Sequence, residues 1–432
     1  MGRWGLEPFG TLLGRIEVPG DKSISHRALM LAAVAAETSH VGGLPQGEDV
    51  RSTAACLRHL GIDIDASADG SACVRGAGID GLRPSTVPLP CGNSGTTMRL
   101  LAGLVAGSAF GTILDGDRSL RSRPMERIAE PLRAMGATVI TRAGGRPPLE
   151  VQGARLRGVT YRTPVPSAQV KSCVLLAGLH ADGDTVVHEE RLSRDHTERM
   201  LASMGAEITG GAADGGVRLR PRPRLGALQG RVPGDVSSAA YWVAAASVAE
   251  HADLELPGVG VNPTRSAVLG VLREWGAAIE IEPQAEWHGE PCASLRVRSD
   301  SGLRGGVIEA EAVTGLIDEL PLLALIGPLT DEGVEIRGAA ELRVKESDRI
   351  TSVCAALRAL GAQVDEFPDG LAVPGRQGLT GGTVDACGDH RIALATAAVA
   401  GAASGPIEVR GADAAAVSYP GFLEQLRSAA SR

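Results

Sequence analysis

The sequence has few aromatic residues and no long apolar run. Phe, Trp and Tyr make up only 3% of the 432 residues, so the cores must consist mainly of aliphatic side chains. Single-stranded nucleic-acid binding needs aromatic stacking platforms, and the net charge of −8 argues against a phosphate-backbone binder. The longest apolar stretches, such as residues 320–326, are far shorter than a membrane span. We therefore expect neither nucleic acid nor a membrane as a partner.

The sequence also lacks the common metal, redox and nucleotide motifs. Its seven cysteines are scattered without a C-x-x-C pair, and no H-E-x-x-H or P-loop pattern occurs. Gly76, Gly78 and Gly81 match G-x-G-x-x-G, but the proline-containing segment that follows cannot open a helix. The first residues contain no apolar signal segment. These features predict no metal site and a cytoplasmic protein.

One short pattern recurs along the chain. A leucine is followed four residues later by glycine and then by a short alternating segment, and the copies start at Leu57, Leu132, Leu201, Leu272 and Leu357. Each copy predicts a helix that ends at a glycine C-cap and leads into a strand. Residues 422–426 form a partial sixth copy, which predicts a final helix without its strand. This repeat indicates six α/β units.

A second repeat divides the chain into halves. The segments 18–21 and 232–235 are both Val-Pro-Gly-Asp, and each precedes a helix-like apolar run. We infer two domains of three units each. One consists of residues 20–234, and the other of residues 1–19 and 235–432. The strand at 11–18 is expected to join the later half.

Candidate anion-binding residues of the first half cluster at predicted helix starts. Residues 22–27 and 167–172 combine small polar and basic residues there, and a helix N-terminus favours an anion. Residues 91–99 form a small-residue loop suited to a phosphate or carboxylate. Each of these segments is equally consistent with an ordinary helix cap or tight turn. The arginines at 118, 121 and 123 suit bidentate anion capture, or a surface cluster neutralised by Asp115 and Asp117.

The later half adds acids to the basic residues. Asp318 and Glu319 precede an apolar helix, where an anionic cap is the simpler explanation. Residues 341–349 mix three basic and three acidic side chains, which predicts either a site or a surface ion-pair lattice. The triplet at 389–391, Asp-His-Arg, precedes an Ala-rich helix and is also consistent with a structural Asp–Arg pair.

In this order, the segments resemble the 5-enolpyruvylshikimate-3-phosphate (EPSP) synthase family. The resemblance rests on residues 19–27, 92–96, 123–124, 193–197, 342–349 and 389–391. It implies a two-domain inside-out α/β barrel with six βαβαββ repeats, three per domain, and an active site in the inter-domain cleft. It also implies no metal and no organic cofactor. We expect a monomer.

The resemblance implies transfer of the enolpyruvyl group of phosphoenolpyruvate to the 5-hydroxyl of shikimate 3-phosphate, with release of phosphate from a tetrahedral intermediate. This step belongs to the shikimate pathway, which leads to chorismate and the aromatic amino acids. The implied ligands of shikimate 3-phosphate are Lys22, Ser23, Arg27, Ser167, Ala168, Gln169, Arg194, Asp318 and Lys345. Those of phosphoenolpyruvate are Lys22, Gly95, Arg123, Gln169, Arg349 and Arg391.

The implied catalytic groups are Asp318, Glu346 and Lys22. Glu346 handles the methyl proton, whereas Asp318 and Lys22 handle the hydroxyl proton, and either of the two fits the role of base. Three positions depart from the common family pattern. Ala168 replaces a serine, His196 replaces a tyrosine, and Val417 replaces a lysine. Gly95 resembles the form of the family that the inhibitor glyphosate blocks.

Two other functions are consistent with parts of the sequence. The enolpyruvyl transferase that acts on UDP-N-acetylglucosamine shares the fold, but it carries Lys-Asn at the first site and a cysteine in the arginine loop. Here Ser23 follows Lys22, and residues 115–124 contain no cysteine. A non-catalytic anion-binding α/β repeat protein is the second alternative. It gains nothing from Asp318 and Glu346 placed among the cations.

Overall fold

The computed structural model describes residues 2–211, 216–299 and 302–431, which form two compact units. Unit 1 comprises Met1–Pro19, Gly234–Ala285 and Pro291–Arg432, and unit 2 comprises Gly20–Pro233 and Glu286–Glu290. The short segment Glu286–Glu290 therefore belongs to unit 2, although the chain on both sides of it belongs to unit 1. The sequence contained no signal for this segment.

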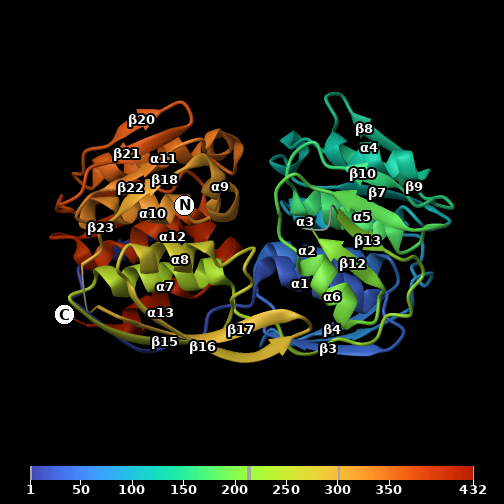
Figure 1. The fold of residues 1–432 in the computed structure, drawn as a ribbon, viewed down its shortest axis with the longest axis horizontal. Coiled ribbons are helices and arrows are strands. Elements are labelled where there is room, and N and C mark those ends of the chain that lie inside the picture. The colour runs from blue at the N-terminus through green and yellow to red at the C-terminus, as the bar shows by residue number, and fades with distance from the viewer. Residues whose placement is uncertain (1, 212–215, 300–301, 432) are drawn as a thin grey trace. The chain divides into compact units, whose positions relative to one another are not determined.

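Unit 2 contains three four-stranded sheets, ordered β14-β3-β5-β4, β6-β7-β9-β8 and β10-β11-β13-β12 (Figure 1). In each sheet the first two strands are parallel, and the remaining pairs are antiparallel. The strands are β3 (Thr38–Gly42), β4 (Asp63–Ala66), β5 (Ala72–Arg75), β6 (Leu89–Pro90), β7 (Gly111–Asp115), β8 (Thr138–Arg142), β9 (Arg146–Gln152), β10 (Thr160–Arg162), β11 (Thr185–His188), β12 (Ile208–Gly211), β13 (Gly216–Leu219) and β14 (Gln229–Arg231). The helices are α1 (Lys22–Ala33), α2 (Glu48–His59), α3 (Gly95–Val105), α4 (Glu126–Met135), α5 (Ala168–Gly178) and α6 (His196–Ser203).

Unit 1 also contains three sheets, ordered β18-β19-β21-β20, β16-β17-β15-β2-β24 and β1-β23-β22. The strands are β1 (Arg3–Leu6), β2 (Thr11–Arg15), β15 (His251–Gly260), β16 (Ala278–Trp287), β17 (Glu290–Arg298), β18 (Gly306–Ile308), β19 (Val334–Ile336), β20 (Asp365–Phe367), β21 (Gly370–Val373), β22 (Gly382–Asp385), β23 (Ile407–Arg410) and β24 (Ala430–Ser431). The helices are α7 (Val236–Val248), α8 (Ala267–Glu274), α9 (Ala310–Leu316), α10 (Leu320–Ile326), α11 (Arg349–Ala359), α12 (His390–Ala398) and α13 (Phe422–Ala429).

The order of elements confirms the expected fold class. The elements from β6 to β9 follow the order βαβαββ, and the elements from β10 to β13 repeat it. In unit 1, β2 from the N-terminal segment pairs in parallel with β15, as predicted for the strand at 11–18. The two-domain α/β fold is therefore present, and two of its units show the complete βαβαββ order.

The helices of each unit form its interior, because their residues are small or apolar. In α7, every residue from Val236 to Ser247 is buried, and in α1 every residue from Ile24 to Ala33 is buried. Strands such as β7 alternate between exposed and buried positions, so one face of the sheet meets solvent. Helix starts, rather than helix faces, therefore carry the polar residues of the interior.

The recurring glycines end helices as predicted. Gly61, Gly136, Gly205, Gly276 and Gly361 follow α2, α4, α6, α8 and α11, and all have positive φ angles. The final repeat differs from its prediction, because α13 is followed by the two-residue strand β24, which pairs with β2. So short a strand has too few residues to show an alternating pattern in the sequence.

No single helix in the described ranges has the length and apolar character needed to cross a membrane. One pair of helices, Ala310–Leu316 and Leu320–Leu329, passes that test only as a segment bent by 109°.

A left-handed glycine and a helical glycine predict opposite effects of substitution by alanine. Gly136 has φ = 115° with no atom closer than 3.7 Å to an added Cβ, so G136A introduces backbone strain without overlap. It should lower the free energy of unfolding by about 1–2 kcal/mol. Gly270 lies inside α8 with open space around its Cβ position, so G270A should raise it by about 0.5–1 kcal/mol. Urea unfolding of both variants measures the difference, and equal shifts would contradict the assignment of the C-cap.

Candidate active site

The first group of candidate residues lies at the start of α1 in unit 2. Asp21 caps the helix by accepting a hydrogen bond from the amide of Ile24 (2.9 Å). Lys22 points its ammonium at Asp49 on α2, with 3.1 Å between Nζ and Oδ2. Burial opposes ionisation of Asp49, but Lys22 and then His26 lower its pKa below the usual value. The acid of this group is therefore ionised, and it pairs with Lys22.

Arg27 is buried among neutral partners. Its Nε donates to Thr197 Oγ1 and its Nη2 to Ser172 Oγ, both at 2.7 Å, and its Nη1 donates to the carbonyl of Ser23 at 2.9 Å. Burial lowers the pKa of Arg27 to about 10, and the charge of Arg194 adds to this effect. A guanidinium fixed by neutral oxygens keeps its charge for an anion. Arg27 is therefore suited to bind one.

The second group surrounds the start of α3. Ser94 caps this helix by accepting from the amide of Thr97 (3.1 Å). A Cβ added to Gly95 would lie 3.0 Å from Nη1 of Arg99 and 3.4 Å from Nη1 of Arg123, so two cations flank this glycine. Arg123 also donates to Asn93 Oδ1 at 2.6 Å. The exposed amides of a helix start and two guanidinium groups meet here, which is an anion-binding arrangement.

Arg99 is a site residue to which the sequence analysis assigned no role. Its Nη1 donates to the side chain of Gln169 on α5, and Gln169 donates in turn to Thr96 Oγ1 at 2.9 Å. Burial, together with Arg127 and Arg123, lowers the pKa of Arg99 to about 10. The available signal was its spacing: it follows Gly95 by four residues and lies on the same face of α3.

A neutral hydrogen-bonded chain joins the two groups. His26 Nδ1 lies 2.6 Å from Thr53 Oγ1, which lies 2.7 Å from Thr97 Oγ1. Burial lowers the pKa of His26 to about 3, so its ring is neutral at physiological pH. The starts of α1 and α3 are thus held together without a further charge.

The arginine loop contains one structural and one candidate functional residue. Arg121 is exposed and donates to Asp115 Oδ1 at 2.8 Å, which fits the surface-pair alternative. Arg123 instead contacts Asn93 in the loop before α3. The surface ion pair therefore describes Arg121, whereas Arg123 remains the candidate for anion capture.

The segment before α6 is fixed by a buried lysine. Lys171 Nζ lies 2.7 Å from both Glu189 Oε2 and Glu198 Oε1. Ser193 donates its hydroxyl to Glu189 Oε1 at 2.5 Å, next to the half-buried Arg194. Ser167 caps α5 by accepting from the amide of Val170 (3.4 Å), and Ala168 is the first residue of that helix.

The His196 side chain is buried, and its ring contacts the carboxylate of Glu290. Its Nδ1 lies 2.8 Å from Oε1 of Glu290, and both side chains are only 1% exposed. Glu290 belongs to the short segment Glu286–Glu290 of unit 2.

The candidate residues of unit 1 converge on Arg349, which is 1% exposed. Its Nε donates to Asp389 Oδ2 at 2.8 Å, its Nη2 donates to Glu346 Oε2 at 2.7 Å, and its Nη1 lies 3.6 Å from Asp318 Oδ1. Burial disfavours the charge of Arg349, but Asp389 and Glu346 raise its pKa above the ordinary value. One guanidinium thus contacts three carboxylates.

Arg391 completes this cluster. Its Nη1 donates to the backbone carbonyl of Asp318 at 2.8 Å, and its Nη2 lies 3.6 Å from Asp318 Oδ2. Burial opposes its charge, yet Asp318 raises its pKa well above the usual value. Asp389 pairs with Arg349 and caps α12 through the amide of Arg391 (2.9 Å), so the simple Asp389–Arg391 pair considered from sequence is not formed.

Other charges in residues 341–349 form the ion-pair lattice that was the alternative. Arg343 donates to Asp348 Oδ2 at 2.8 Å and lies 3.3 Å from Glu366 Oε1. Lys345 donates to the exposed Glu341 at 2.6 Å. The segment is therefore divided, because Glu346 and Arg349 join the Arg349 cluster whereas Arg343 and Asp348 form the predicted ion-pair lattice.

The two sets of site residues differ in charge. Cations dominate the unit 2 set, in which Asp49 is the acid paired with Lys22. In unit 1, four acids share two arginines: Asp318, Glu346 and Asp389 contact Arg349, and Asp318 and Glu319 contact Arg391. The unit 2 set is therefore suited to hold anions, and the unit 1 set combines cations suited to an anion with carboxylates able to accept or donate a proton.

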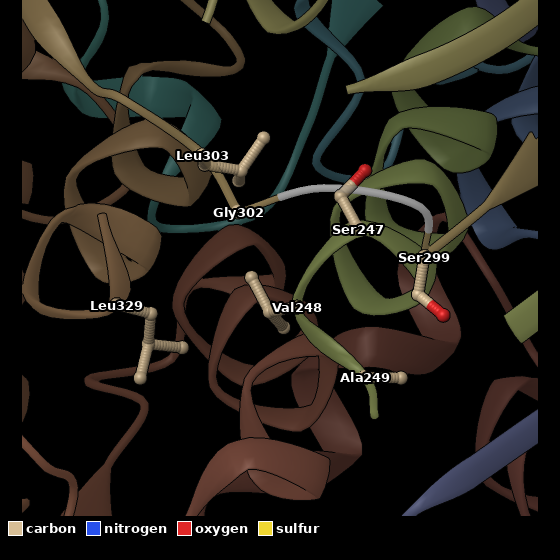
Figure 2. Close-up of a pocket in the computed structure, with 7 residues that line it drawn as sticks. All are labelled: Ser247, Val248, Ala249, Ser299, Gly302, Leu303 and Leu329. Atoms are coloured by element: carbon tan, nitrogen blue, oxygen red, sulfur yellow. The ribbon is translucent and has the colours of Figure 1, made fainter. Parts of the chain in front are cut away.

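A cavity of about 420 Å³ in unit 1 does not coincide with either set (Figure 2). Its described lining residues are Ser247, Val248, Ala249, Ser299, Gly302, Leu303 and Leu329. These are apolar, small or hydroxyl-bearing residues without charge, so we assign no part of the active site to this cavity.

Comparison with known proteins gives a consistent result. The family model EPSP synthase (3-phosphoshikimate 1-carboxyvinyltransferase) matches residues 6–426. The 3-phosphoshikimate 1-carboxyvinyltransferase of Synechococcus sp. (strain JA-3-3Ab) is 50% identical over 98% of this chain and 95% of its own length. That of Xanthomonas campestris pv. campestris (strain B100) is 47% identical over 97% and 95%. The solved EPSP synthase of Acinetobacter baumannii is similar with a TM-score of 0.92 and 38% identity, covering 100% of this chain and 98% of its own.

The buried Asp389 predicts a pH-dependent contribution to stability. Burial opposes its ionisation, but Arg349 holds its pKa below the usual 3.8. The stabilisation is therefore complete above the unfolded-state pKa and is lost as pH falls below about 4. D389N can still cap α12 but leaves Arg349 with one carboxylate fewer, and should lower the free energy of unfolding by about 3 kcal/mol at pH 7.

Denaturant unfolding of D389N and the parent between pH 7 and pH 3 measures this effect, and the difference should shrink at the acidic end. D253N is the control, because Asp253 forms an exposed pair with Arg296 that is worth at most about 1 kcal/mol. A difference that stays constant down to pH 3 would refute the assignment.

Proposed function

The chain belongs to the EPSP synthase family, and from this premise we propose how its two sets of side chains carry out the family's reaction. The enzyme is a 3-phosphoshikimate 1-carboxyvinyltransferase of the shikimate pathway, which transfers the enolpyruvyl group of phosphoenolpyruvate to shikimate 3-phosphate. The observation that carries the proposal is the Arg349 cluster, where acids and arginines are held together.

We propose that unit 2 binds most of the shikimate ester. Arg27, fixed by Ser172 and Thr197, supplies a buried positive charge. The other proposed contacts from this unit are Lys22, Ser23, Ser167, Ala168, Gln169 and Arg194. Ala168 provides no hydroxyl, so the phosphate has one donor fewer there, and Arg194 compensates for the histidine at position 196. From unit 1, Asp318 receives the ring hydroxyls and Lys345 the phosphate.

We propose that phosphoenolpyruvate is bound by cations of both units. The unit 2 contribution is Lys22, the backbone at Gly95, Arg123 and Gln169, and we add Arg99 because it orients Gln169 and flanks Gly95. The unit 1 contribution is Arg349 and Arg391. Two multiply charged anions need several fixed cations to approach each other, and the acids of unit 1 alone disfavour that approach. We therefore propose that both domains, residues 20–234 and residues 1–19 with 235–432, contribute side chains to one pair of substrates.

The proposed chemistry has two stages. In the first, the 5-hydroxyl oxygen forms a bond to C2 of phosphoenolpyruvate, its proton passes to Asp318 or to the neutral amine form of Lys22, and C3 gains a proton from protonated Glu346 to become a methyl group. In the second, the bond from C2 to the phosphate oxygen breaks, phosphate leaves, and the methyl group returns its proton to Glu346. Each transfer needs a positioned acid or base. Holding both substrates in register makes the first step effectively intramolecular.

Three further properties are proposed. Glyphosate is proposed to bind beside Gly95, and unchanged activity at high glyphosate concentration would refute this.

The cytoplasm is the proposed location, because the described cysteines are free thiols. The enzyme is proposed to be a monomer, since exposed large apolar side chains such as Leu13, Ile113 and Phe367 lie singly on different strands. Sedimentation equilibrium tests the last point.

E346Q tests the catalytic role of Glu346. Glutamine retains the shape of the side chain and can still accept from Arg349, but it cannot remove a proton. We expect kcat to fall by about 10²- to 10⁴-fold and the KM values to change little. The assay is phosphate release from phosphoenolpyruvate with either shikimate 3-phosphate or UDP-N-acetylglucosamine. E335Q is the control, because Glu335 pairs with the exposed Arg337.

Turnover by the parent enzyme only with the shikimate ester supports the assigned acceptor, whereas release with the UDP-sugar would favour the alternative transferase. An E346Q variant with unchanged kcat would refute the proposed role of Glu346.

G95A tests the phosphoenolpyruvate subsite. The added methyl group would lie 3.0 Å from Arg99 and 3.4 Å from Arg123, so it displaces guanidinium groups that we place around the donor substrate. We expect the KM for phosphoenolpyruvate and the inhibition constant of glyphosate to rise about tenfold or more. The KM for shikimate 3-phosphate should change less than twofold. Steady-state kinetics measures both KM values and the inhibition constant. A rise in the KM for shikimate 3-phosphate alone would place the phosphoenolpyruvate subsite elsewhere.

A further inference from the structure

We propose that Arg265 and Glu319 form a buried positioning pair that sets the orientation of Arg391 relative to Asp318. This inference rests on the roles proposed above for Asp318 and Arg391. Neither Arg265 nor Glu319 is proposed to touch a substrate.

Glu319 is a buried acid surrounded by donors. It is 2% exposed, and its Oε1 accepts from the hydroxyl of Ser237 on α7. The same oxygen lies 3.5 Å from Nη1 of Arg265 and 3.5 Å from Nη1 of Arg391. Glu319 therefore links the arginine proposed to bind substrate to a second arginine behind it.

Arg265 comes from the segment before α8 and is 3% exposed. Its Nη2 donates to Ser237 Oγ at 2.5 Å and lies 3.5 Å from Asp235 Oδ1. Asp235 in turn caps α7 by accepting from the amide of Ser237 (2.8 Å). The start of α7 thus fixes the position of Arg265, and Arg265 in turn fixes the position of Glu319.

A buried ion pair is weak evidence for stability, because desolvation of both charges offsets their attraction. An apolar pair of similar volume would hold α7 and α10 together as well. The presence of two charges next to Arg391 is better explained by their effect on that side chain.

The effect follows from the geometry of Arg391. Its Nη1 donates to the backbone carbonyl of Asp318 at 2.8 Å and also faces Glu319, while its Nη2 stays 3.6 Å from the Asp318 carboxylate. Glu319 holds Nη1 on the backbone side of Asp318. Without Glu319, the nearest strong acceptor for the Arg391 guanidinium would be the Asp318 carboxylate itself. Arg391 would then turn away from phosphoenolpyruvate and occupy the group proposed to move the hydroxyl proton.

E319Q tests this directly. We expect the KM for phosphoenolpyruvate to rise about tenfold and kcat to fall, whereas the KM for shikimate 3-phosphate, which depends mainly on unit 2, changes less than twofold. T330V is the matched control. The buried Thr330 hydroxyl donates to the carbonyl of Gly327 near the opposite end of α10, so its loss should lower the melting temperature and leave both KM values unchanged.

R265M and the double variant R265M/E319Q separate positioning from stability. R265M leaves Glu319 with one cation fewer and should lower the melting temperature. The double variant removes the excess buried charge, so the melting temperature should recover while the KM for phosphoenolpyruvate stays high. Recovery of that KM together with the melting temperature would show a structural role only and overturn the proposal. Equal rises of both KM values in E319Q, or no change in either, would overturn it as well.

R391K distinguishes failure of this inference from failure of the proposed function. If R391K raises the KM for phosphoenolpyruvate and E319Q does not, Arg391 binds the donor without help from the pair. If R391K has no effect, the role of Arg391 is itself wrong, and the positioning proposal falls with it.

Discussion

The architecture of the site depends on keeping charged side chains ionised inside a dry interior. Arg349 illustrates the constraint: it is almost completely buried, and it remains charged because Asp389 and Glu346 hydrogen-bond to it and Asp318 lies within ion-pair distance. Removing the buried Asp389 weakens the compensation of this buried charge, which is more costly than losing a surface pair. Arg27 and Arg99 meet the same constraint differently, since the hydrogen bonds described above for them go to neutral oxygens and burial lowers their pKa values. Their charge is available to an anionic substrate.

The repeated fold supplies the positions for these charges. Each unit buries helices made of small and aliphatic residues, so polar groups enter the interior mainly where a helix begins. Caps at Asp21, Ser94, Ser167, Asp235 and Asp389 fix those starts. The amides and dipole at each start favour anions, so the caps also prepare the binding surface. Six copies of one α/β unit thus yield several helix starts with different side chains, from which two complementary sets arise.

Local signals in the sequence predicted the fold and part of the site. The Leu…Gly pattern identified five helix ends, because a left-handed C-cap requires glycine, and the expected residues near Gly95 and Arg349 are found together. The sequence did not predict contacts that depend on tertiary packing. Arg99 was visible only by its spacing from Gly95, and the partnership of Arg265 with Glu319 joins residues 54 positions apart with no shared motif. The segment Glu286–Glu290 and the short strand β24 were missed for a different reason. Neither has enough residues to form a periodic pattern in the sequence.

The central claim is that a cationic set in unit 2 and an acidic set in unit 1 act on one pair of substrates. A crystal structure of the Glu346→Gln enzyme with both phosphoenolpyruvate and shikimate 3-phosphate tests it most directly. The account predicts that phosphoenolpyruvate contacts Arg123 of unit 2 and Arg391 of unit 1 at once, with the 5-hydroxyl of the shikimate ester beside Asp318. Substrates bound entirely by side chains of a single unit would contradict it.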